Sequence, residues 1–129
     1  LKSSEAVYFP RVGLVSQDLM VRSRVEASLP FPLVMVEAGA PRLEGGFDLL
    51  LLDLNRDAAD RLGWLAELAA PQASEVICFG PHTEMAELNP TAKAAGASRC
   101  VANSHLPETL QRWLRSWGGG PTERGEQAL

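Results

Sequence analysis

The chain is poor in lysine and cysteine, and each shortage excludes a class of protein. Only two of its 129 residues are lysines, and sixteen acidic residues outnumber twelve basic ones, for a formal net charge of −4. Since the arginines are also scattered, the chain lacks the basic face that nucleic-acid binding requires. Its two cysteines, Cys78 and Cys100, are too few for a disulfide framework and match no metal-ligand spacing. We therefore expect two buried structural thiols in a reducing compartment.

Long apolar runs and glycine-rich loops are also missing. No run approaches the about 20 residues that span a bilayer, and no charged segment followed by an apolar one opens the chain. The glycines match neither a dinucleotide loop nor a phosphate loop. The sequence therefore indicates a cytoplasmic protein without a cofactor. A hydrophobic content of 46% is enough for one domain to close its own core.

What the chain does contain is an apolar stretch that ends on a carboxylate. Residues 49–52 are all leucine, which is typical of a strand buried on both faces in a parallel sheet covered by helices. Asp53 follows at the C-terminal end of this strand. Because open α/β sheets bind ligands at that edge, Asp53 is the first candidate functional residue.

Four further strand-like segments alternate with helical patterns. The expected strands are 11–16, 33–38, 75–80 and 99–102, and the expected helices are 19–29, 58–70, 90–95 and 107–117. Asp18, Asn55 or Asp57, and Asn89 are the expected caps of the first three helices. Between 39 and 46 too few residues remain for the usual crossover helix, so this helix is expected to be shortened or missing.

This alternation predicts a three-layer α/β fold, a doubly wound, flavodoxin-like sheet of five parallel strands. The order 2-1-3-4-5 is chosen by analogy among such sheets. We expect a lead-in segment at 1–10, one domain at 11–117, and a glycine-rich flexible tail or linker at 118–129.

Several features together resemble a response-regulator receiver domain of two-component signal transduction. They are Asp53 with Asn55 two residues beyond it, the AGAS segment at 95–98, Arg22 in the first helix, and the closing amphipathic helix. The resemblance covers residues 11–117. It implies that Asp53 stands at the position that accepts a phosphoryl group in that family.

The positions that assist this chemistry in the family are altered here. Ser16 and Gln17 stand where the family has acidic Mg²⁺ ligands, and Gly80 stands where it has a hydroxyl residue at the end of the fourth strand. After the fifth strand, Asn103 replaces the lysine and Ser104 replaces the proline. Asp18 lies one residue beyond the family's acidic positions and is predicted to cap the first helix. Losing metal ligands and an ammonium group is expected to raise the barrier to phosphoryl transfer by several kcal/mol.

The sequence therefore predicts a pseudo-receiver that is not an enzyme, binds no metal and acts by protein–protein interaction. Its partner would be a separate protein, a covalently linked output or kinase domain, or a second copy bound through the last helix. Trp113 and Trp117 form the possible partner surface, and Trp64 and Met85 are weaker candidate anchors.

Three alternatives stay open. Asp53 accepts a phosphoryl group after all, with Asp18 as a displaced metal ligand. In the second alternative, Asp53, His82 and His105 form the site of a small metal-dependent enzyme, since both histidines follow strands that end at the same edge. In the third, Asp53 caps backbone amides of the next loop and the histidines are exposed.

Overall fold

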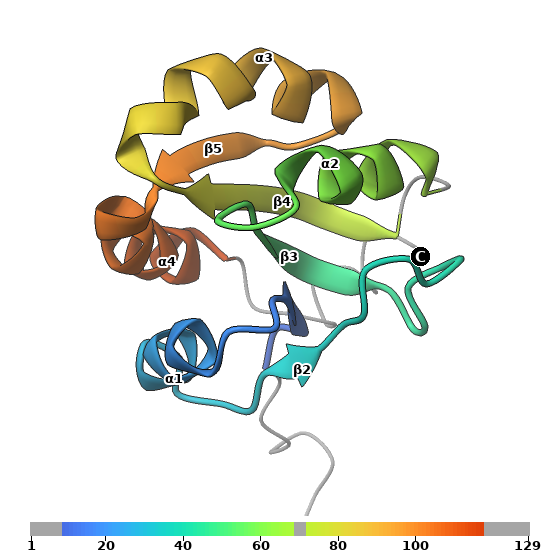
Figure 1. Ribbon diagram of the computed structural model, residues 1–129. Coiled ribbons are helices and arrows are strands. Elements are labelled where there is room, and N and C mark those ends of the chain that lie inside the picture. Colours follow the sequence, from blue (N-terminus) through green and yellow to red (C-terminus); the bar gives the residue numbers. More distant parts are fainter. Residues whose placement is uncertain (1–8, 69–71, 118–129) are drawn as a thin grey trace, which may run out of the picture.

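The computed structural model describes residues 9–68 and 72–117 (Figure 1). The strands are β1 (Val12–Val15), β2 (Val34–Met35), β3 (Phe47–Asp53), β4 (Ala73–Gly80) and β5 (Arg99–Ala102). The α-helices are α1 (Leu19–Ala27), α2 (Ala58–Glu67), α3 (Met85–Ala95) and α4 (Leu106–Ser116). Single 3-10 turns, η2 (His82–Glu84) and η3 (Asn103–His105), lead into α3 and α4. The expected lead-in and tail lie outside the described residues, apart from residues 9 and 10.

The predicted architecture is confirmed. Five parallel strands pair in the order β2-β1-β3-β4-β5. Helices α1 and α4 cover one face of the sheet and α2 and α3 cover the other, which makes three layers (Figure 1). This is a flavodoxin-like α/β fold. Among the described residues, no helix has both the length and the apolar character needed to cross a bilayer.

The leucine run of β3 is apolar at every position because both of its faces are buried. Leu50 and Leu52 belong to the core beneath α2 and α3, whereas Leu49 and Leu51 belong to the core beneath α1 and α4. All four side chains are 0% exposed. This central strand holds Asp53 firmly at the carboxyl edge of the sheet.

Between β2 and β3, residues 36–46 form a looped crossover without a helix, as expected from its length. Leu43 in this loop is buried in the core beneath α2 and α3. The indole nitrogen of Trp64 on α2 donates a hydrogen bond of 2.7 Å to the carbonyl oxygen of Ala40. The loop therefore packs where a crossover helix usually lies. The strand before it is shorter than expected, since β2 contains only Val34 and Met35.

The predicted start of the third helix was wrong. Asn89 is not its cap, because α3 begins at Met85 and Pro90 lies inside it. A proline there removes one backbone hydrogen bond. Packing of Leu88 and the fully buried Ala92 on the sheet outweighs that loss. The predicted stop at Gly96 is confirmed, since this residue caps the helix in a left-handed conformation with φ of 115°.

Candidate functional site

Asp53 ends β3 at the carboxyl edge of the sheet, as predicted, but its side chain is enclosed. Only 3% of the residue is exposed. One carboxylate oxygen, Oδ1, accepts hydrogen bonds from the backbone nitrogen of Asn55 at 2.8 Å and from its side-chain amide at 2.7 Å. The other, Oδ2, accepts a hydrogen bond of 2.7 Å from the hydroxyl of Ser16. Both oxygens are therefore engaged by neighbouring side chains.

The sequence analysis missed a fourth member of the site, Arg61 on α2. Its side chain is 6% exposed. Its Nη1 donates to the backbone carbonyl oxygen of Asp53 and lies 4.0 Å from Oδ2 of the same residue. The helical period was the available signal, because Arg61 lies on the buried face of α2 with Leu62 and Leu65. The arginine thus places a buried positive charge next to the carboxylate of Asp53.

Asn103 joins the loop after β5 to the loop after β3. Its amide and that of Asn55 exchange two hydrogen bonds, of 2.8 Å and 3.0 Å. Ser104, the next residue, is exposed. A neutral pair of amides therefore closes the space between these two loops.

The candidate metal ligands after β1 are otherwise occupied. Asp18 is confirmed as the cap of α1, since its Oδ1 accepts hydrogen bonds from the backbone nitrogens of Met20 at 2.8 Å and Val21 at 3.4 Å. The hydroxyl of Ser16 donates a hydrogen bond to Asp53, and Gln17 is neutral and exposed. This donor set does not fit Mg²⁺, which prefers carboxylate oxygens that are free to coordinate.

A hollow of about 380 Å³ opens beside the carboxylate, between the start of α1 and the loop after β3. Its rim carries two of the most exposed hydrophobic residues of the described chain, Leu19 at 75% and Met20 at 64%. Arg56 and Arg61 also line it. The hollow thus offers apolar and basic groups beside Asp53, which also lines it although only 3% of the residue is exposed.

Gly80, which the resemblance to receivers aligned with a hydroxyl residue, ends β4, and the space above it is filled. A Cβ atom there would lie 2.8 Å from Cε of Met85 and 3.4 Å from the backbone carbon of Leu54. A serine or threonine at this position would force Met85 to move. The sequence showed only that residue 80 has no hydroxyl group. The structure shows that the side chain of Met85 fills the space that a side chain at position 80 would occupy.

Both candidate histidines are exposed and lie in the 3-10 turns that follow their strands, His82 in η2 and His105 in η3. Throughout residues 9–68 and 72–117, no three His, Cys, Asp or Glu side chains gather into a group that could hold a metal ion. Asp53, His82 and His105 therefore do not assemble into the metal site considered above.

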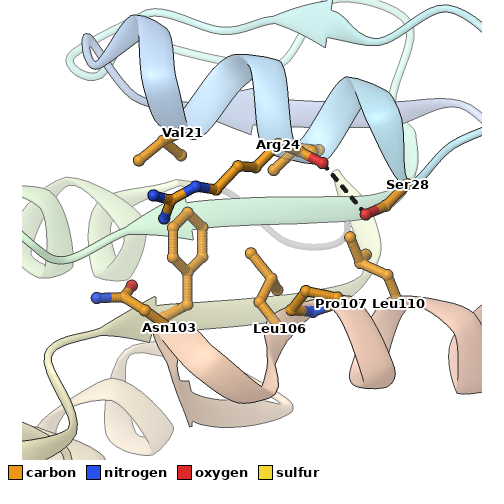
Figure 2. A pocket seen from close by; sticks show the side chains of 9 residues that line it. Val21, Arg24, Ser28, Asn103, Leu106, Pro107 and Leu110 are labelled. Carbon is orange, nitrogen blue, oxygen red and sulfur yellow. Dashed lines mark hydrogen bonds between the residues drawn. The ribbon is translucent and has the colours of Figure 1, made fainter.

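A second hollow lies between α1 and α4, and Figure 2 shows Val21 and Arg24 of α1 facing Leu106 and Leu110 of α4 across it. Its volume is about 40 Å³, which leaves room for no more than a few water molecules. Asn103 stands at one end of it (Figure 2). This hollow is too small to hold a substrate.

The tryptophans divide between core and surface. Trp113 and Trp117 at the end of α4 are both half-buried, and their rings stack with centroids 6.4 Å apart. Trp64 was a wrong candidate for a partner anchor, because it is 8% exposed and packs from α2 into the core. The stacked pair on α4 is therefore the aromatic surface that remains.

The two thiols are register partners on neighbouring strands, Cys78 on β4 and Cys100 on β5. Cys78 is 0% exposed. Burial, with a smaller contribution from Cys100, raises the pKa of the Cys78 thiol to about 12. Burial also raises the pKa of the half-buried Cys100. Both residues are thiols near neutral pH, as expected for core cysteines.

An aspartate that accepts a phosphoryl group must present a free oxygen in line with the donor, and a metal ion or ammonium group must neutralise the developing charge. Here the carboxylate is enclosed by hydrogen-bond donors and by one buried arginine. These contacts tie β1, β3 and α2 together, which is a structural role.

Comparison with known proteins identifies no relative, because no family model, curated protein or solved structure matches the chain.

Proposed function

We propose that this chain is a receiver-like signalling module that acts by binding a protein, and that Asp53 accepts no phosphoryl group. The observation that carries the proposal is the enclosure of Asp53, which is 3% exposed and has donors on both of its oxygens. The shape of the fold is kept while the groups required for phosphoryl transfer are absent or engaged elsewhere.

The module is further proposed to pass its signal to a partner in the cytoplasm. A cytoplasmic module of a two-component type would pass its signal to a separate protein or to a covalently linked output or kinase domain. The contacts that enclose Asp53 then hold the loops after β1, β3 and β5 in one arrangement. A partner would recognise this fixed surface without a phosphorylation step.

Incubation of the chain with a small phosphodonor and Mg²⁺ is expected to form no acyl phosphate. Asp53 lacks a free oxygen, and the neighbouring Ser16 and Gln17 offer no metal site. Intact-protein mass spectrometry measures the product directly. Asp53→Asn is the matched control, because wild type and variant should show the same absence of added mass. Stoichiometric labelling of the wild type that disappears in Asp53→Asn would show a working receiver instead.

The proposed partner surface is the end of α4, where the stacked Trp113 and Trp117 are half-buried. Aromatic side chains of this kind supply much of the binding energy at protein interfaces. The simplest partner is a second copy of the chain, bound through the same helix. Self-association through α4 would bury the exposed parts of both rings.

Trp117→Ser is expected to weaken self-association at least about tenfold, since loss of a hot-spot aromatic costs about 2 kcal/mol or more. Sedimentation velocity over a range of concentrations measures this change. Phosphodonor and Mg²⁺ should leave the association of both proteins unaltered. Association that increases only with the phosphodonor would contradict the proposal, and a wild type that stays monomeric would exclude a second copy as the partner.

A further inference from the structure

Three sulfur-containing residues from three elements, Cys78, Cys100 and Met85, are linked by strand register and by one sulfur–sulfur contact. Cys78 on β4 and Cys100 on β5 are paired in register, so their Cα atoms are direct neighbours across the sheet. Both side chains belong to the face covered by α2 and α3. The sulfur of Met85, the first residue of α3, lies 3.6 Å from the sulfur of Cys100. The cluster is hereafter called the sulfur cluster.

The absence of a side chain at Gly80 allows Met85 to reach Cys100. Side chains alternate along a strand, so position 80 is on the same face of β4 as Cys78. A Cβ atom at Gly80 would lie 2.8 Å from Cε of Met85. The missing side chain therefore leaves the space that the end of Met85 occupies beside Cys100.

The three residues run from the surface into the core. Met85 and Cys100 are half-buried, and Cys78 is 0% exposed. An ion can therefore meet the thioether and the outer thiol before the inner thiol. The positive charge of Lys93 acts on Cys100 and favours its thiolate, although burial has the larger effect and raises the pKa of this thiol.

Two thiols and a thioether are soft ligands, and such ligands select Cu(I) over hard cations such as Mg²⁺ and Ca²⁺. Metal–thiolate bonds are about 2.3 Å long, as for zinc. Two sulfur atoms at 3.6 Å from one another are compatible with such bonds to one shared ion. No oxygen or nitrogen ligand is needed, because Cu(I) accepts few ligands.

We propose that Cys78, Cys100 and Met85 form a three-sulfur binding site for Cu(I). Each thiol that becomes a ligand releases its proton to solvent, and the sulfur lone pair forms the bond to the ion. The ion enters as Cu(I), so no electron is transferred. The site lies on the face of the sheet under α3 and is independent of Asp53 and of the proposed function.

The test is a competition titration of the reduced full chain with Cu(I) and a coloured Cu(I) chelator under anaerobic conditions. The wild type is expected to retain one equivalent of the ion. Cys78→Ser and Cys100→Ser should each weaken binding by at least about 100-fold, the upper loss seen for outer-shell partners of metal ligands. Met85→Leu, which keeps the volume of the side chain, should weaken binding by about tenfold or more.

Matched controls separate this site from other ligands in the chain. Met35→Leu changes a methionine on β2 that is 37% exposed, and it should leave Cu(I) binding unaltered. His82→Ala and His105→Ala should also leave it unaltered. Ag(I), which has similar ligand preferences and does not change oxidation state, should raise the unfolding temperature of the wild type but not of Cys78→Ser.

Three results would overturn the proposal. They are failure of the wild type to compete with the chelator, equal binding by wild type and Met85→Leu, and loss of binding in either histidine variant. Thermal unfolding of each variant without metal shows whether it is folded. If a serine variant does not fold, Met85→Leu and the Ag(I) shift of the wild type still decide the outcome.

Discussion

Arg61→Met is expected to lower the free energy of unfolding by about 3–5 kcal/mol, the range for removing one partner of a buried ion pair. The arginine is 6% exposed and the Asp53 side chain is 4% exposed. Methionine would leave the carboxylate without its nearest cation and the carbonyl oxygen of Asp53 without the donor on α2. Urea unfolding followed by circular dichroism measures the change.

Arg56→Met is the matched control, because Arg56 is exposed and lines the same hollow. Surface substitutions of this kind usually change stability by less than about 0.5 kcal/mol. If Arg61→Met also changed stability by that little, the enclosure of Asp53 would not depend on the arginine.

A double-mutant cycle shows whether Arg61 and Asp53 act as a pair. Asp53→Asn removes the charge but keeps an oxygen and an amide for Asn55 and Ser16. Residues in one network couple by about 0.5–3 kcal/mol. The loss in the double variant Asp53→Asn/Arg61→Met should therefore be smaller than the sum of the two single losses. Simple additivity would mean that the two charges do not interact.

Trp64→Ala is expected to lower the free energy of unfolding by about 3–5 kcal/mol, as for other buried tryptophans. The indole lies on the buried face of α2 and holds the looped crossover through its hydrogen bond of 2.7 Å to the carbonyl oxygen of Ala40. Because no helix secures residues 36–46, this variant should also loosen the loop. Urea unfolding measures the stability, and the rate of trypsin cleavage after the exposed Arg42 measures the loosening.

Two controls make this result specific. Trp64→Phe removes the hydrogen bond and keeps most of the apolar volume, so it should cost about 1–3 kcal/mol through the carbonyl left without a donor. Glu67→Ala changes an exposed residue on the same helix and should leave both measurements near the wild-type values. Equal cleavage rates in wild type and Trp64→Ala would show that the loop is held by other contacts.

Local sequence patterns were sufficient for the parallel α/β class and the missing crossover helix, whereas the strand order was chosen by analogy. The unbroken leucines of β3 predicted a strand covered on both faces, and the short segment between 39 and 46 predicted a crossover without a full helix. The capping role of Asp18 was also visible, because a cap and the amides it serves are adjacent in the chain. Periodicity, capping and segment length are local properties, so a single sequence displays them.

The local patterns failed where packing decided the outcome. Pro90 suggested a helix start but lies within α3, since burial of Leu88 and Ala92 outweighs one missing hydrogen bond. Trp64 was expected as a weak surface candidate, yet the looped crossover covers it. Neither result follows from propensity, because both depend on which distant residues complete the core.

The sequence by itself determined that Asp53 ends a buried strand at the carboxyl edge of a parallel sheet, because the unbroken leucines before it are a local pattern. The tertiary structure alone decided what encloses the carboxylate. Ser16 is 37 residues from Asp53, and Asn103 is 48 residues from its partner Asn55. Arg61 reaches Asp53 only because α2 packs with that face against β3. Contacts between distant residues depend on strand register and helix packing, and these arise only when the whole chain has folded.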